Sequence, residues 1–193
     1  MSFRIEEKLL VNKNQLIEFK EYLFKEAKAL HKPRSVKSLY FENNNKDLYN
    51  DSIEGLVPRK KIRIRTYPDT ADKGFYLENK ISSIEGRFKT SKKINKMQFL
   101  KFKNLGIYDT QYGICFPFLE VTYRREYFKI EDYRVSIDQN IKYNLYNGRD
   151  LGEDENCIVE IKANFNKDQD LLISKFHLQR TRFSKYCNGY DKI

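Results

Sequence analysis

Residues 59–67 read RKKIRIRTY, a run in which charged and aliphatic side chains alternate. In a β-strand, residues two apart share a face, so Arg63 and Arg65 lie on one side and Ile62 and Ile64 on the other. Two neighbouring guanidinium groups repel each other unless water solvates them or an anion lies between them. A face open to water is the ordinary explanation, since many antiparallel sheets have one. The stretch predicts a strand and leaves open whether its charged face is solvated or binds an anion.

The composition favours a folded, basic protein with an anionic partner. A chain of 193 residues with 15% aromatic side chains can bury a sizeable core, and we expect residues 1–193 to form one domain. The formal net charge is +10 and the isoelectric point is about 9.3. Such a charge favours nucleic acid, a phosphorylated small molecule or a membrane surface as the partner, without choosing among them.

Cysteine and histidine usage indicates a reducing compartment. Cys115, Cys157 and Cys187 contain no C-x-x-C pair, which argues against a disulfide framework and a structural zinc site. His31 and His177 are the only histidines, and neither is near a cysteine in the sequence. The sequence has no apolar run long enough to span a bilayer and no signal-peptide pattern, so we expect a cytoplasmic protein.

Hydrophobic periodicity predicts an α+β domain dominated by antiparallel strands. Helices are expected at residues 12–30, 95–106 and 166–178, and residues 43–55 read as a polar loop. The expected strands are residues 3–11, 36–43, 60–67, 74–82, 85–94, 118–130, 133–146 and 157–165.

The alternation seen in residues 59–67 recurs in nearly every expected strand. The charged or polar sides carry Glu6 with Lys8, Arg63 with Arg65, Glu78 with Lys80, Arg87 with Lys89, Tyr123 with Arg125, Arg134 with Ser136 and Asp138, and Glu160 with Lys162. The opposite sides carry Ile62, Ile64, Leu77, Val135, Ile137, Val159 and Ile161, which we expect to be buried. A closed antiparallel β-barrel of about eight strands with flanking helices explains this pattern, because one face of every strand then lines a common interior. An interior lined by Lys and Arg requires a polyanion, and a linear triphosphate or polyphosphate fits a long cationic tunnel.

Seven segments in this order carry a family resemblance: SLYFEN, RKKIRIRTY, YLENK, YRREYF, YRVSIDQN, VEIK and FSKYCNG. The chain resembles the VTC domain, the polyphosphate polymerase domain of the vacuolar transporter chaperone complex, within the CYTH-like triphosphate tunnel superfamily. The resemblance spans almost the whole chain and implies the tunnel fold.

The resemblance also implies which side chains act. The catalytic cations are expected to be Arg63, Arg65, Lys80, Arg125, Arg134, Lys162 and Lys185. The residues expected to bind substrate are Lys8, Lys89, Tyr123 and Ser184. Glu160 matches the family's metal-binding glutamate, with Glu6 and Glu78 as further candidates for holding Mn²⁺ or Mg²⁺.

The sequence departs from the family patterns in two places. Hydrolytic members begin with E-x-E-x-K, whereas positions 4, 6 and 8 are Arg4, Glu6 and Lys8 here, which leaves fewer carboxylates for metal and favours the polymerase branch. The family's K-x-R segment after the E-x-K strand becomes FKTSKKI, in which Lys89 and Lys92 compete for the lysine position.

The implied function is transfer of the γ-phosphate of ATP onto a growing inorganic polyphosphate chain. Because the acceptor is a phosphate oxygen that is already anionic, no Ser-His-Asp triad or general base is needed. A triphosphatase on the same fold and a non-catalytic polyphosphate or nucleotide-binding module are the alternatives. We expect ATP and polyphosphate as partners and no specific nucleic acid. Because no membrane span or regulatory domain is recognised, membrane-associated partner proteins are left to supply those functions.

Two features stay open in the sequence. Asp138 either caps a turn or contributes to a metal site. The lysine-rich run over residues 89–103 is either a solvated face or a surface that draws polyphosphate towards the site.

Overall fold

The computed structural model describes residues 4–164, 173–174 and 176–193. The chain divides into two compact units, and each is described here by itself. The first unit comprises Met1–Ser35, Tyr123–Ile141 and Glu153–Phe183, and the second comprises Val36–Thr122, Lys142–Gly152 and Ser184–Ile193.

Three long strands run through both units: β2 (Lys28–Glu42), β7 (Gly113–Ile130) and β8 (Tyr133–Leu145). The first unit adds β1 (Arg4–Val11), β10 (Cys157–Asn164) and the short β11 (Gln179–Arg180). Its strand order is β11-β1-β10-β8-β7, and the pairs of β10 with β1 and β8 are antiparallel.

Helix α1 (Lys13–Glu26) covers the apolar side of the first unit. Asn12 caps it in a capping box with Gln15, as the Asn cap in the sequence predicted. Phe19 and Leu23 are fully buried among the inward residues of β1, β8 and β10. We predicted a helix that continues to residue 30, which is wrong, because Ala27 is extended and the sheet hydrogen bonds of β2 begin at Lys28.

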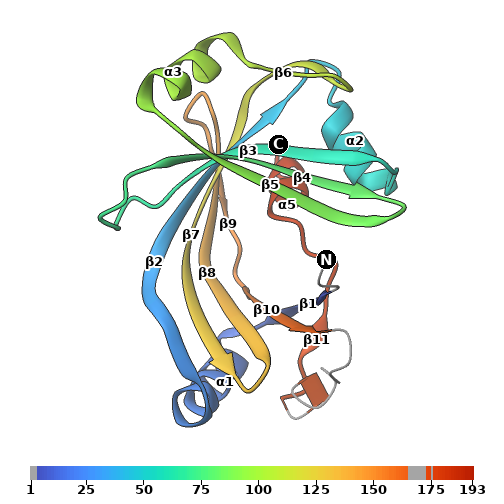
Figure 1. Ribbon diagram of the computed structural model, residues 1–193. Helices are drawn as coiled ribbons and strands as arrows, with labels where there is room; N and C mark the ends of the chain where they lie inside the picture. Colours follow the sequence, from blue (N-terminus) through green and yellow to red (C-terminus); the bar gives the residue numbers. More distant parts are fainter. Residues whose placement is uncertain (1–3, 165–172, 175) are drawn as a thin grey trace. The chain divides into compact units, whose positions relative to one another are not determined.

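The second unit is built on an antiparallel meander. Strands β3 (Arg59–Thr66), β4 (Phe75–Ser83) and β5 (Gly86–Ile94) follow β2 in the order β2-β3-β4-β5 (Figure 1). The predicted hairpin between β4 and β5 is confirmed, with Ser83 paired to Gly86 at its turn. Helix α3 (Lys96–Leu105) follows β5, and the short β6 (Ile107–Asp109) and β9 (Asp150–Glu153) pair with β7 and β8.

Two helices of the second unit were not predicted. Residues 43–55 contain α2 (Asp47–Glu54) instead of a loop, because the Glu42 carboxylate and the Asn43 side chain accept the amide protons of its first turn. Helix α5 (Lys185–Tyr190) is short, and the Ser184 side chain caps it. Both helices depend on hydrogen bonds that hydrophobic periodicity cannot reveal. The third predicted helix, residues 166–178, falls largely outside the described residues.

The predicted fold class, an antiparallel sheet with flanking helices, is confirmed, with eleven strands in the described residues instead of about eight. The predicted apolar sides are buried at Ile62, Ile64, Val135, Ile137, Val159 and Ile161, whereas Leu77 is only half-buried. Strand pairing within either unit does not test closure of the sheet into a tunnel, which stays a prediction.

Candidate functional site

The charged side of β3 is buried in the second unit. Arg63 and Arg65 are only 6% and 7% exposed, so the solvated face that the sequence left open is excluded. In the strand register, Arg63 lies opposite Tyr40 of β2 and Glu78 of β4. Burying two adjacent guanidinium groups is unfavourable unless each has partners, and the structure supplies them.

Glu78 is the carboxylate that joins these cations. Its Oε2 lies 2.6 Å from Arg63 Nη2 and 3.7 Å from Arg65 Nη1, and its Oε1 contacts Lys89 Nζ of β5. Burial alone would raise the pKa of Glu78, but Arg63, Arg65 and Lys89 lower it to about 2. Three cations share one carboxylate, so the cluster keeps an excess of positive charge.

Tyr40 belongs to the same cluster, and we did not predict it from the sequence. Arg63 Nη1 donates a hydrogen bond to the Tyr40 hydroxyl at 2.9 Å, and the guanidinium lies 5.6 Å from the ring centroid. Burial alone would raise the pKa of Tyr40, but Arg63, Arg65 and Lys185 lower it. The signal available in the sequence was the alternation of Ser38 and Tyr40 in SLYFEN, which places both residues on one face.

The register separates the two lysines that compete in the sequence. Lys89 lies opposite Lys80, whereas Lys92 lies opposite Leu77, on the apolar side of the sheet. Lys89 therefore shares the face of Glu78 and contacts it, and Lys92 does not share that face. Lys80 is an exposed residue on the Lys89 side.

The residues predicted from FSKYCNG lie at the start of α5. The Ser184 hydroxyl accepts a hydrogen bond from Lys61 Nζ at 2.7 Å as well as from the backbone amide of Cys187. Lys185 is half-buried, and its charge acts on Tyr40. In the second unit, the predicted residues Arg63, Arg65, Lys80, Lys89, Ser184 and Lys185 thus lie on β3, β4, β5 and α5.

A buried hydrogen-bond network positions α5. The Tyr186 hydroxyl donates to Glu42, which is 3% exposed and also accepts the amides of Leu48 and Tyr49 at 3.1 and 3.0 Å. The ring of Tyr186 lies 5.2 Å from that of Tyr40. Glu42 thereby joins the start of α2 to α5, next to the arginine cluster.

The first unit holds a second group of predicted residues, centred on Arg125 of β7. Arg125 binds Asp138 of β8 through two hydrogen bonds, from Nε at 2.5 Å and from Nη2 at 2.6 Å, and its guanidinium lies 5.2 Å from the Tyr123 ring. Burial alone would lower the pKa of Arg125, but Asp138 raises it. Asp138 is 1% exposed and lies in the interior of β8, so it is a buried partner of Arg125 and does not cap a turn.

Glu160 lies among cations of the same unit. In the register it faces Lys8 of β1 and Ser136 of β8. Burial alone would raise the pKa of Glu160, but Arg125, Lys162 and Lys8 hold it well below its usual range. Lys8 donates to the carbonyl of Phe183 at 2.7 Å. Arg134, opposite Lys162 in the register, is exposed.

Two carboxylates of the first unit lie beside one ammonium group. Lys162 Nζ lies 2.7 Å from Glu160 Oε1 and 3.4 Å from Glu6 Oε2, so two carboxylates converge on one ammonium. One or two carboxylates can hold Mg²⁺ or Mn²⁺ when substrate phosphates and water supply the other ligands. The described residues contain no group of three His, Cys, Asp or Glu side chains that could hold a metal alone. Glu160 with Glu6 offers two carboxylates to a cation that arrives with phosphates, whereas Glu78 is the one carboxylate in its ion-pair cluster with Arg63, Arg65 and Lys89.

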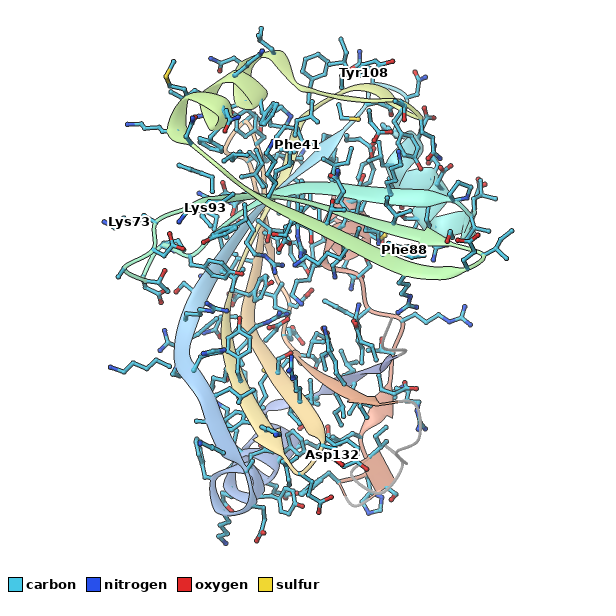
Figure 2. The ribbon with its side chains drawn as sticks, in the orientation of Figure 1. Phe41, Lys73, Phe88, Lys93, Tyr108 and Asp132 are labelled. Carbon is cyan, nitrogen blue, oxygen red and sulfur yellow. The ribbon has the colours of Figure 1, made fainter. Side chains whose placement is uncertain are left out.

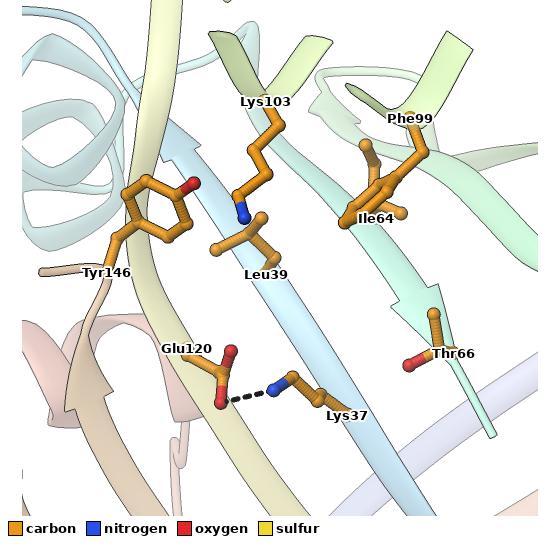
Figure 3. A pocket seen from close by; sticks show the side chains of 8 residues that line it. All are labelled: Lys37, Leu39, Ile64, Thr66, Phe99, Lys103, Glu120 and Tyr146. Carbon is orange, nitrogen blue, oxygen red and sulfur yellow. Dashed lines mark ion pairs between the residues drawn. The ribbon is translucent and has the colours of Figure 1, made fainter. Parts of the chain in front are cut away.

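A small pocket of the second unit lies on the other side of the sheet. It has a volume of about 130 Å³, and its floor is Leu39, Ile64 and Thr66, which alternate with the cluster residues along β2 and β3 (Figure 3). Lys37 and Glu120 form an ion pair of 2.7 Å at its edge. This pocket is separate from the arginine cluster.

The antiparallel sheet with flanking helices is a fold that this chain shares with proteins of known structure. A candidate adenylate cyclase from Bacillus halodurans matches with a TM-score of 0.64 at 14% identity, covering 95% of this chain and 94% of that one. HpAC1 from Hippeastrum, described as having a dominant triphosphatase activity, matches with a TM-score of 0.59 at 14% identity, covering 98% and 96%. A model of the VTC domain matches residues 3–193, and the chain belongs to the VTC domain family. The resemblance seen in the sequence is thereby confirmed.

Two other comparisons bear on the chain. A search of curated proteins finds no match. Among the described residues, no helix is both long enough and apolar enough to cross a membrane.

Proposed function

We propose that this chain is a metal-dependent polyphosphate polymerase that transfers the γ-phosphoryl group of ATP to the end of an inorganic polyphosphate chain. The observation that carries the proposal is the buried pair Arg63 and Arg65, held beside one carboxylate and the Tyr40 hydroxyl. A substrate phosphate can bind this excess positive charge through forked guanidinium donors. Membership of the VTC domain family supports the choice of polyphosphate as the product.

The transfer needs charge stabilisation more than it needs a base. A terminal oxygen of the acceptor chain attacks the γ-phosphorus, the bond between that phosphorus and the β–γ bridging oxygen breaks, and ADP leaves. The chain grows by one phosphate. Within the second unit, Arg63 and Arg65 supply cations that bind phosphate oxygens and stabilise developing charge. Within the first unit, Arg125 and Lys162 carry charge suited to the same role.

A divalent cation would be held by Glu160 with Glu6. Mn²⁺ or Mg²⁺ held there would supply positive charge that offsets the repulsion between phosphate oxygens. The role of Lys162 is to align both carboxylates, since it contacts each of them.

A triphosphatase is the second candidate, favoured by the structural likeness to HpAC1. Hydrolysis would use the same cations, with water in place of the phosphate acceptor. The replacement of the first carboxylate of the E-x-E-x-K pattern by Arg4 supports the polymerase over the hydrolase. We also propose that residues 1–193 act as one functional domain with ATP and polyphosphate as its ligands.

Incubation with ATP and Mn²⁺, followed by separation of the products on a gel, tests this proposal. The wild type should produce chains longer than triphosphate, and Arg65→Ala and Glu160→Gln should each reduce the yield at least about tenfold, as expected when a charged contact to a transferred phosphate is lost. Glu120→Gln, in a partly exposed ion pair with Lys37 by the separate pocket, is the matched control and should retain the activity. Free phosphate without chains would assign the protein to the triphosphatases, and triphosphate binding without turnover would assign it to the binding modules.

A further inference from the structure

The small pocket of the second unit is built from β2, β3, β7, α3 and the residue after β8. Its floor is the pair Leu39 and Ile64, which lie directly opposite each other in the register of β2 and β3. Phe99 of α3 forms one wall, and its ring stacks on that of Phe75 with centroids 4.2 Å apart. Tyr146 lines the other side (Figure 3). Because the Phe99 ring is held by Phe75, this wall is a fixed part of the fold.

The charged groups of the pocket leave one positive charge. Two lysines and one glutamate give the lining a net charge of +1. Lys37 and Glu120 neutralise each other in their ion pair at the edge. The remaining cation is Lys103, the last lysine of the run over residues 89–103, and its Nζ lies 5.5 Å from the centroid of the Tyr146 ring. Figure 3 shows this ammonium group pointing from α3 towards the floor at Leu39.

The surroundings of Lys103 favour an anion as its neighbour. Lys103 is half-buried, and the side chains of the floor, Leu39 and Ile64, are hydrocarbon and only 7% and 1% exposed. A cation that loses part of its hydration needs a compensating contact, and the face of a tyrosine ring restores only part of it. A carboxylate on a ligand would complete it, because a hydrogen bond between two charged groups is stronger than one between neutral groups.

The volume of the pocket limits the apolar part of a ligand to one ring. The pocket measures about 130 Å³, which is close to the cavity of about 150 Å³ that binds benzene in an engineered protein. A hydrocarbon floor with an aromatic side chain on either side suits a flat apolar body. Inorganic phosphate would leave this floor uncovered, and a neutral hydrocarbon would leave the ammonium of Lys103 without an anion. The lining therefore selects a monoanion with an apolar ring.

The pocket and the arginine cluster occupy opposite sides of β2 and β3. Leu39 and Ile64 alternate with Tyr40 and Arg63 along these strands, so their side chains point the other way. Phe41, two residues beyond Leu39, shares the pocket side and is 1% exposed, and Figure 2 shows it on the side of β3 where α3 and β6 lie. The pocket and the cluster therefore share no side chain.

We propose that this pocket binds a small organic monoanion, a carboxylate carried by a single apolar ring. The carboxylate accepts a hydrogen bond from Lys103, and the ring lies on Leu39 and Ile64 between Phe99 and Tyr146. The inference does not depend on the polymerase proposal, since it uses no side chain of that site.

The test is a titration of the full chain with benzoate at constant ionic strength, followed by the NMR chemical shifts of the backbone amides. The wild type should bind benzoate with a dissociation constant of about 10 mM or lower. Acetate, which lacks the ring, and benzamide, which lacks the charge, should each bind at least about threefold more weakly. Lys103→Gln should weaken benzoate binding at least about threefold. Lys101→Gln, an exposed lysine of the same helix outside the pocket lining, is the matched control and should leave the constant unchanged.

A competition experiment separates the pocket from the arginine cluster. An excess of inorganic triphosphate should leave benzoate binding unchanged, and displacement of benzoate would assign it to the cluster and overturn the inference. Failure of the wild type to bind benzoate would also overturn it, as would equal effects of Lys103→Gln and Lys101→Gln. Binding of acetate or benzamide as tight as that of benzoate would refute the proposed ligand class. Synthesis of polyphosphate chains tests the polymerase proposal separately, so the two can fail independently.

Discussion

Replacing Glu78 with Gln removes the carboxylate that three cations share. Gln keeps the size of the side chain and loses the charge, so Arg63 and Arg65 stay buried with their main partner neutralised. We expect the free energy of unfolding to fall. Lowering the pKa of Glu78 from 4.5 to about 2 contributes about 3 kcal/mol, because a tenfold change in proton affinity corresponds to about 1.4 kcal/mol.

The pH dependence gives this prediction its sign. The pKa of Glu78 is lower in the folded protein than in the unfolded chain, so its stabilisation is complete above about pH 4.5 and is lost as the pH falls towards about 2. The difference in the free energy of unfolding between the wild type and Glu78→Gln should therefore shrink over that interval. Urea unfolding followed by circular dichroism at several pH values measures it.

Adding a ligand to the stability measurement tests the proposed site. Inorganic triphosphate can take the place of the missing carboxylate beside Arg63 and Arg65, so it should raise the melting temperature of Glu78→Gln more than that of the wild type. Glu120→Gln is the control, since its partly exposed pair with Lys37 should contribute less than about 1 kcal/mol. Equal stabilities of the two variants, or a loss for Glu78→Gln that does not change between about pH 6 and about pH 3, would refute the reasoning.

Three further predictions concern both units. Asp138→Asn should lower the free energy of unfolding by about 3 kcal/mol or more in urea, because it leaves Arg125 without its bidentate partner; a loss below about 1 kcal/mol would contradict this. Phe19→Ala should cost about 3–5 kcal/mol in the same assay, because the ring is fully buried under α1, and a surface-like loss would show that the helix packs elsewhere. Tyr186→Phe keeps the ring and removes its hydrogen bond to Glu42, and calorimetry should show a loss of about 1–3 kcal/mol, whereas an unchanged melting temperature would mean that Glu42 holds α5 by other contacts.

The residues of the candidate site were predictable where charged side chains recur at every second position of a strand. The alternation in residues 59–67 placed Arg63 and Arg65 on one face, and the structure confirms this arrangement in β3. Partners were less predictable, because they come from other strands. Tyr40 was missed for that reason, since its contact with Arg63 depends on the register between β2 and β3.

The predicted elements failed where tertiary contacts outweigh local pattern. Apolar residues at helical spacing continue to residue 30, but strand β2 begins at Lys28. Residues of β2 form hydrogen bonds with neighbouring strands of the sheet, and these outweigh the local preference for another helical turn. The polar run over residues 43–55 gave no apolar stripe, and α2 forms there because Glu42 and Asn43 accept its first amides.

The sequence by itself determined the antiparallel strands, the charged and apolar sides of each strand, and the family. A side-chain period of two and an ordered set of short motifs can both be recognised without knowing which residues are in contact. Only the tertiary structure decided that the arginine face is buried, that Glu78 lies against three cations, and that Lys89 and not Lys92 shares their face. These facts depend on strand register, and a shift of one residue would move every side chain to the other side of the sheet.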